Sequence, residues 1–332
     1  MLLPVVIDVD AVDDQSSEGA RLERENLLDR LLEYGLPHIR AADMKKFVSR
    51  LKSIPVSESQ RWTEAMRSIG INNFDASGVL PSDLEPVFGK RNALVVLSTS
   101  GADGQMEGAG LKAPIARVPR TQIEYAAASH VRQSDSIRKR EEWATEDLWP
   151  NTSLDLVGDQ RFAPLFRSCR RISLVDRYAF VSFRSDGKAS GLSWLVRQIA
   201  ANSQKPCKVS LYSIHSPAKE RQDPFEDFHR WVDALEEQCA GMNGELNLFL
   251  GPDNLYRELA HDRDLRVDDS RIIDLGKGVD AFSGGKVKQR CPFSYRVLKR
   301  SEQLGFYRQL ENQLRENRGL MSFNRTLGTG FE

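Results

Sequence analysis

The sequence predicts an α/β protein built from two domains. The chain has 332 residues, which is long enough for two separate hydrophobic cores. Short apolar runs alternate with amphipathic stretches, and the alternation is most regular in the second half. Because strands that alternate with helices commonly form a sheet flanked by helices, each half is expected to be a layered α/β domain.

The first half begins with an apolar run at residues 5–10, which predicts a buried strand that ends in aspartates. Three amphipathic helices are expected after it. Their apolar faces contain Leu28, Phe47 and Trp62, and these stripes of apolar residues are interpreted as core faces.

A second strand is expected at residues 92–98 and a third at 114–119, followed by a helix that starts near Arg120. The glycine-rich residues 101–110 between these strands predict a surface loop. Residues 130–149 are dense in charges of both signs, which is typical of a solvated connecting helix at a domain boundary.

In the second half, four strands are expected at residues 171–176, 208–214, 245–250 and 271–274, with helices at 192–201, 225–235 and 299–315. The tail after Gly319 is expected to be loosely held. The expected domains are residues 1–129, a charged helical linker at 130–155, a second domain at 156–300, and a C-terminal helix and tail at 301–332.

The composition is that of an ordinary globular protein, with 40% hydrophobic and 28% charged residues. The 47 basic residues balance the 47 acidic ones, so any surface for nucleic acid or an anionic membrane must be a local patch. No apolar run approaches the length of about 20 residues that a transmembrane segment needs. The four cysteines are widely separated and form no C-x-x-C pair, which favours a reducing cytoplasm.

A histidine-centred motif in the second half is the main candidate for chemistry. His261, Arg263 and Asp268 have the spacing H-x-K-x4-D, with arginine in place of lysine. The motif resembles that of the phospholipase D-like phosphodiesterases, which implies catalytic roles for these three residues and no cofactor. In such chemistry one histidine attacks phosphorus and a second protonates the leaving oxygen. Because the chain has one copy of the motif, an active site would require a homodimer.

A glycine turn close to this motif is the candidate ligand-binding region. Gly276 and Gly278 would let backbone amides approach an anion, and Lys277 would add positive charge. Arg263 could fork onto phosphate oxygens, and Arg266 is assigned to the same ligand-binding group. Binding without turnover is therefore as consistent with these residues as hydrolysis. The alternative is that His261, Asp262 and Arg263 form a hydrogen-bonded core cluster that joins strands.

Residues 161–298 resemble the MIT C-terminal domain family, which has a phospholipase D-like fold. The resemblance rests on Asp176 and Tyr178 and on four further stretches, residues 205–209, 261–266, 276–282 and 292–295. It implies a phospholipase D-like α/β domain that binds phosphorylated ligands, which are phosphoinositide headgroups in the eukaryotic case. The helical trafficking module that precedes this domain in eukaryotes is not recognisable here.

Residues 1–130 resemble the PIN-type nuclease domains at residues 6–10, 95–99 and 116–120. The resemblance implies a three-layer α/β/α fold in which carboxylates hold Mg²⁺ or Mn²⁺. The candidate metal ligands are Asp8, Asp10 and Asp103, whose hard oxygens suit such ions. The sequence departs from the family because no clear acid stands in the helix that begins at Asp43. Acids at the end of a strand also cap loops and helices, so this alternative stays open for Asp8 and Asp10.

Together these observations predict a protein that binds a phosphorylated ligand or nucleic acid, with phosphodiesterase or nuclease activity as the enzymatic form of the hypothesis. A nuclease-like domain joined to this second domain, without the trafficking module, suggests a bacterial protein that acts with other protein subunits in defence against phages or plasmids. The alternative is a non-catalytic adaptor subunit of a protein complex. One basic patch is also a candidate surface and consists of Arg167, Arg170, Arg171, Lys205 and Lys208.

Overall fold

The computed structural model confirms the α/β class and contains two sheets in two compact units, Leu2–Trp143 and Ala144–Glu332. It describes residues 2–12, 17–88, 92–98, 114–118, 121–215, 228–260, 263–298, 301–317 and 319–327. The boundary between the units falls inside residues 130–155, the segment expected to be a linker. Among the described helices, none combines the length and the apolar character needed to cross a bilayer.

The N-terminal unit is a three-layer α/β/α domain around a six-stranded sheet of order β3-β2-β1-β4-β6-β5. All neighbouring strands are parallel except β5, which is antiparallel to β6. Its strands are β1 (Leu3–Ile7), β2 (Gly35–Arg40), β3 (Asn72–Phe74), β4 (Ala93–Leu97), β5 (Ile115–Arg117) and β6 (Ile123–Ala127). Its helices are η1 (Val9–Ala11), α1 (Glu18–Tyr34), η2 (Ala41–Asp43), α2 (Met44–Ser53), α3 (Val56–Ile69), α4 (Pro81–Phe88), η3 (Ala128–Gln133) and α6 (Asp135–Thr145).

Strand β4 shows why both faces of this sheet are covered. Its five residues are all buried. Leu94 and Val96 pack in the core cluster that includes residues of α1, α2 and α3, whereas Val95 and Leu97 pack with residues of α4. Because successive side chains of a strand point to opposite faces, a continuous apolar run supplies both layers of the core.

Two predictions for this unit are wrong. The segment after Arg120, expected to be a helix, is strand β6, and its five residues are buried beside β4. Residues 130–143, expected to be a solvated linker, belong to the N-terminal unit. The buried Glu124 explains part of this, because its carboxylate accepts the backbone N–H groups of Asp135 and Ser136 at 2.8 Å each and so caps α6.

The C-terminal unit contains a seven-stranded mixed sheet of order β12-β11-β10-β7-β8-β9-β13. Its strands are β7 (Arg171–Val175), β8 (Cys207–Ile214), β9 (Gly244–Gly251), β10 (Asp264–Val267), β11 (Arg271–Asp274), β12 (Ser294–Val297) and β13 (Met321–Leu327). Strands β7, β8 and β9 are parallel, and the flanking strands are antiparallel to their neighbours. The tail expected to be loose therefore contains β13, which is held by its pairing with β9.

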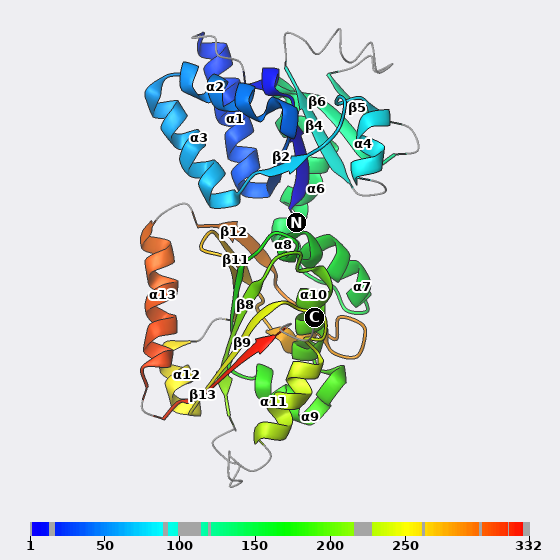
Figure 1. The fold of residues 1–332 in the computed structure, drawn as a ribbon. Helices are drawn as coiled ribbons and strands as arrows, with labels where there is room; N and C mark the ends of the chain where they lie inside the picture. Colours follow the sequence, from blue (N-terminus) through cyan, green and yellow to red (C-terminus); the bar gives the residue numbers. More distant parts are fainter. Residues whose placement is uncertain are drawn as a thin grey trace, which may run out of the picture. The chain divides into compact units, whose positions relative to one another are not determined.

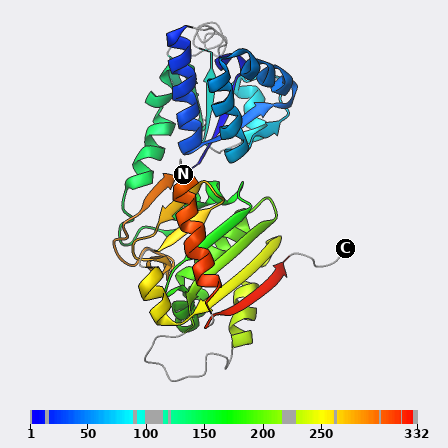
Figure 2. The same cartoon turned by 90° about the vertical axis from the view of Figure 1, so that its left-hand side faces the viewer.

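Helices cover both faces of this sheet, and Figure 2 shows α13 (Ser301–Arg315) lying across one of them. Leu310 and Leu314 of α13 share a buried cluster with Val175 and Tyr212 of the sheet and with residues of α12 (Asp253–Leu259). The remaining helices are α7 (Leu154–Val157), η4 (Gly158–Phe162), α8 (Ala163–Phe166), α9 (Ala179–Asp186), η5 (Gly187–Ala189), α10 (Gly191–Asn202), α11 (Phe228–Glu237) and η6 (Val279–Phe282).

Candidate functional site

A cavity of about 350 Å³ lies at the edge of the N-terminal sheet where the parallel strands end. Asp8 follows β1, Arg40 ends β2 and Leu97 ends β4, and all three line the cavity. From β1 the chain builds the sheet in one direction through β2 and β3, and it then returns to the other side of β1 as β4. Ligands of open parallel sheets bind at such a switch point, outside the carboxyl ends of the strands. The fold therefore places the cavity at the position where a ligand is expected.

Two carboxylates at the end of β1 form one wall of the cavity. Asp8 is 6% exposed and caps η1, since its carboxylate accepts the backbone N–H of Asp10 at 3.3 Å. The carboxylate of Asp10 forms ion pairs with the Nζ of Lys46 at 2.9 Å and the Nη2 of Arg50 at 2.8 Å. Partial burial raises the pKa of Asp10, but the bonds from these two cations outweigh that effect, so its pKa lies below the ordinary value. In the described part of the chain, Asp8 has no lysine or arginine partner.

A second ion pair, which the sequence did not predict, also lines the cavity. Arg40 pairs with Asp43, and the Nη1 of Arg40 also donates to the backbone carbonyl of Ser77 at 2.9 Å. Both side chains line the cavity together with Lys46. Three acids and two bases thus face one another around it, and each base is bonded to an acid.

The wall formed by residues 78–80 is held by hydrogen bonds to the side chains of Tyr125 and Asp83. The hydroxyl of Tyr125 donates to the carbonyl of Val79 at 2.6 Å, and the carboxylate of Asp83 accepts the backbone N–H of Leu80 at 3.1 Å. Burial, with a contribution from the negative charge of Asp83, raises the pKa of Tyr125 well above its ordinary value, so this hydroxyl stays a hydrogen-bond donor. Hydrogen bonds within the protein therefore hold this wall of the cavity.

The carboxylates in the described part of the cavity do not fit a resident Mg²⁺ or Mn²⁺. Asp10 and Asp43 are both bonded to cationic side chains, which leaves Asp8 as the one cavity carboxylate without such a bond. Within the described residues, no group of three or more His, Cys, Asp or Glu side chains is arranged to hold a metal ion. Asp103, the third expected ligand, lies outside the described residues, so the metal site stays a prediction.

In the C-terminal unit, Arg263 and the glycine turn do lie together, next to Asp176. The Nη1 of Arg263 donates to the carbonyl of Gly276 at 2.9 Å, and its Nε lies 3.9 Å from the Asp176 carboxylate. Asp176 is 1% exposed and accepts the backbone N–H of Val279 at 2.8 Å. Burial raises its pKa above the ordinary value, although this amide and the arginine favour the charged form. His261 lies outside the described residues.

The amides of the glycine turn do not form the expected anion site. Gly276 donates its N–H to Asp274 at 2.8 Å, and Gly278 donates to the carbonyl of Leu275 at 2.7 Å. The prediction that these amides face a ligand is therefore wrong, because protein acceptors already use them. The side chain of Lys277 is exposed at the same turn. The alternative of a core cluster formed by His261, Asp262 and Arg263 stays a prediction, because His261 and Asp262 lie outside the described residues.

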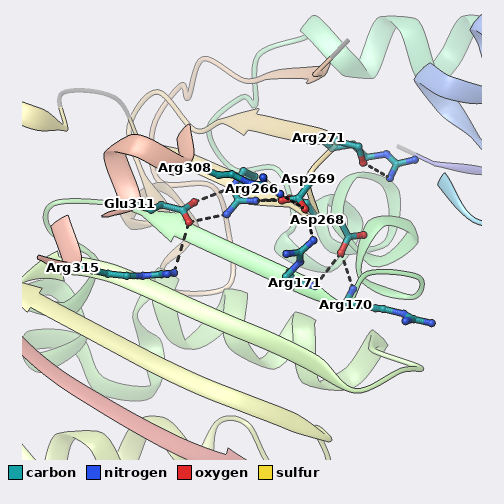
Figure 3. A network of polar contacts seen from close by, with 10 residues as sticks. Arg170, Arg171, Arg266, Asp268, Asp269, Arg271, Arg308, Glu311 and Arg315 are labelled. Atoms are coloured by element: carbon teal, nitrogen blue, oxygen red, sulfur yellow. Dashed lines mark hydrogen bonds and ion pairs between the residues drawn. The ribbon is translucent and has the colours of Figure 1, made fainter. Parts of the chain in front are cut away.

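Asp268 and Arg266 are not part of this constellation. Arg263 precedes β10 and Asp268 follows it, so a strand separates them. At about 3.3 Å per residue, five residues of extended chain span on the order of 16 Å. Arg266 bonds Glu311 at 2.7 Å and Asp269 at 2.8 Å, in a network at the far end of β10 (Figure 3). Their assignment to one site with Arg263 is wrong, because the spacing that resembles a motif spans a whole strand.

The comparisons with known proteins assign no family to the chain. No family model matches it, and no curated protein matches it. Among solved structures, the crystal structure of the phosphatidylserine synthase of Haemophilus influenzae Rd KW20 is similar over 97% of this chain and 82% of that chain. The two share 13% sequence identity, and the TM-score is 0.34, which is too low to establish a common fold. The resemblances to MIT C-terminal and PIN-type domains stay predictions.

Proposed function

We propose that the N-terminal unit binds a phosphate-bearing ligand of nucleotide size in the cavity at the end of β1. The observation that carries this proposal is that basic side chains and a carboxylate without a cationic partner line the same cavity. Lys46 and Arg40 supply positive charge, and Asp8 supplies a carboxylate that no described cation neutralises. A nucleotide has a matching pair of features, an anionic phosphate and hydroxyl or amine donors.

The phosphate would take the two basic side chains as its partners. A lysine has three N–H donors and an arginine has five, so each can bond a ligand oxygen while it keeps its present acid. Charge-assisted hydrogen bonds of this kind are the stronger ones in proteins. Asp8, as an acceptor, would receive a ligand hydroxyl or amine. The ligand is thereby oriented with its phosphate toward α2 and its donor group toward the end of β1.

The size of the cavity limits the ligand. Pockets for small molecules and cofactors usually measure about 300–1,000 Å³, and about 350 Å³ lies near the lower limit. A mononucleotide or the terminal nucleotide of a strand suits this space, whereas a base-paired duplex does not. We therefore expect a nucleotide or a single-strand end rather than the side of a double helix.

Isothermal titration of the full chain with AMP, with orthophosphate and with 5′-phosphorylated RNA and DNA of about four nucleotides tests the proposal. Lys46→Ala is expected to weaken binding about tenfold, since it removes a charged hydrogen bond. Lys45→Ala is the matched control, because Lys45 is exposed and does not line the cavity. Equal affinities of the two variants, or no binding by the wild type, would contradict the proposal. The ranking of the probes separates free phosphate from a nucleotide.

Cleavage of a phosphodiester is a second candidate function, and Asp8 is the observation that favours it. A buried carboxylate without a cationic partner, at the wall of a cavity, is suited to accept a proton from an attacking water. Asp8→Asn would then abolish cleavage of labelled RNA or DNA, whereas binding is expected to weaken far less, because the asparagine oxygen still accepts a hydrogen bond from the ligand. His261→Ala is the corresponding variant for the phospholipase D-like hypothesis. Cleavage that persists in both variants would exclude both routes.

The expected role in bacterial defence stays a prediction, as does the alternative of an adaptor subunit. Purification from the native host distinguishes the alternative, because an adaptor is expected to carry a stoichiometric protein partner whose retention does not depend on Lys46 or Asp8. A defence component is expected to lower phage plaque counts in its host, and this protection is expected to fall with the Lys46→Ala variant.

A further inference from the structure

A fixed turn between β10 and β11 presents a carboxylate to several arginines (Figure 3). The turn contains Asp268, which has a φ of 52°, a left-handed value that few residues other than glycine adopt. Its carboxylate accepts the backbone N–H groups of Arg170 and Arg171 at 2.9 and 3.0 Å. The start of β7 therefore holds the turn in this uncommon conformation, and Asp269 has a defined position next to it.

Asp269 binds three arginines from three elements. Arg171 of β7 and Arg308 of α13 reach one carboxylate oxygen, the latter at 2.9 Å, and Arg266 of β10 reaches the other at 2.8 Å. The side chains of Arg171 and Arg308 are 55% and 54% exposed, whereas that of Arg266 is 10% exposed. One acid thus holds two solvent-facing guanidinium groups close together.

The positive charges of this cluster are not balanced within it. Arg266 also bonds Glu311, which has a further contact with Arg315 at 3.8 Å. Four arginines contact Asp269 or Glu311, and Asp268 adds a third carboxylate on the same turn, which leaves an excess of one positive charge. Like charges held within a few ångströms repel one another, and an anion between them relieves that repulsion.

We propose that Arg171 and Arg308 bind the phosphodiester backbone of a single-stranded nucleic acid on the surface of the C-terminal unit. The planar guanidinium fork matches phosphate oxygens, and backbone contacts need no recognition of bases. Exposed groups on an open surface suit the outside of a polymer. The surface is independent of the cavity, since it lies in the other compact unit.

Fluorescence anisotropy with a labelled single-stranded DNA of about 16 nucleotides, over a series of salt concentrations, tests the inference. The Arg171→Ala/Arg308→Ala double variant is expected to weaken binding at least tenfold at low salt. Loss of two phosphate contacts is also expected to reduce the slope of log affinity against log salt by about 1.4. Arg257→Ala/Arg290→Ala is the matched control, because both side chains are 63% exposed in the C-terminal unit and neither pairs with Asp269 or Glu311.

The inference is overturned if the Arg171→Ala/Arg308→Ala variant and the Arg257→Ala/Arg290→Ala control bind the DNA with the same affinity and slope. It is also overturned if the double variant loses binding to vesicles of phosphatidylcholine and phosphatidylserine but keeps its DNA affinity. AMP affinity distinguishes this surface from the cavity. Lys46→Ala is expected to lower the affinity for AMP, whereas the double arginine variant is expected to leave it unchanged. A thermal unfolding curve close to that of the wild type confirms that the double variant is folded.

Discussion

Gly278 lies directly against Asp176, and an added Cβ at Gly278 would stand 2.3 Å from the Oδ2 of that buried carboxylate. The same Cβ would stand 2.6 Å from the Cδ of Arg263. Gly278 also has a φ of 73° and a ψ of −174°, a conformation that is essentially restricted to glycine. The glycine is therefore required for close packing of the turn on the aspartate and the arginine.

We predict that Gly278→Ala destabilises the C-terminal unit by on the order of 3 kcal/mol, because backbone strain and overpacking add. Gly285→Ala separates the two causes. Gly285 also has a positive φ, 83°, but an added Cβ there would meet nothing within 4 Å. Its expected cost is about 1 kcal/mol, from strain alone. Urea unfolding of both variants measures the difference, and equal losses would show that packing on Asp176 is not the cause.

The buried ion pair of Arg24 and Glu58 joins α1 to α3 by two bonds of 2.8 and 3.2 Å. The side chains are 1% and 9% exposed. Arg24→Met is expected to cost about 3–5 kcal/mol, because it leaves Glu58 charged and buried without a partner. Replacement of both residues, by Arg24→Met and Glu58→Leu, is expected to cost less than the single change.

An exposed pair on the same helices is the control for this prediction. Arg61 and Glu25 are 3.2 Å apart, and their side chains are 50% and 30% exposed. Arg61→Ala is expected to change the free energy of unfolding by less than about 1 kcal/mol. Chemical denaturation measures all three variants, and a double variant that is less stable than Arg24→Met would refute the burial argument.

His215, just after β8, is expected to make stability depend on pH. Burial, and then the positive charge of Arg184, lower the pKa of His215 below 6.5. Below about pH 6.5 the unfolded chain therefore binds more protons at this position than the folded chain, so stability falls as the pH falls. The slope is expected to stay well under about 1.4 kcal/mol per pH unit, since the side chain is half exposed.

His215→Asn is expected to remove this slope. The measurement is the difference in the free energy of unfolding between variant and wild type at several values between about pH 5 and pH 7.5. The variant is expected to gain relative stability on the acid side and none above about pH 6.5. A difference that does not change with pH would show that the histidine has no folded-state shift.

The sequence was sufficient to predict the elements whose apolar pattern is strong. Runs such as residues 92–98 and 245–250 were placed correctly because each is apolar enough to be buried in the middle of a sheet. Strand β2 was missed because Pro37 and His38 interrupt its apolar pattern. Its pairing with β1 is visible only in the folded structure. Without β2, Arg40 could not be placed at the end of a strand, and one side of the cavity went unpredicted.

The candidate site in the second half shows the opposite error. The spacing of His261, Arg263 and Asp268 was treated as a local constellation, although strand β10 separates Arg263 from Asp268 and carries them far apart. Only strand pairing shows that Arg263 shares an edge with Asp176, which lies 87 positions earlier in the sequence. Gly278 was a signal of this proximity in the sequence, because the close packing of Asp176 and Arg263 on the turn leaves room only for glycine at that position.

Hydrogen exchange of the wild type, with and without a saturating 5′-phosphorylated RNA of about four nucleotides, tests the proposed cavity most directly. Slower exchange is predicted for the backbone amides of residues 8–10 and 78–80, which line the cavity. Strand β9, in the other unit, is expected to be unchanged. Binding that leaves residues 8–10 and 78–80 unprotected would contradict the proposal.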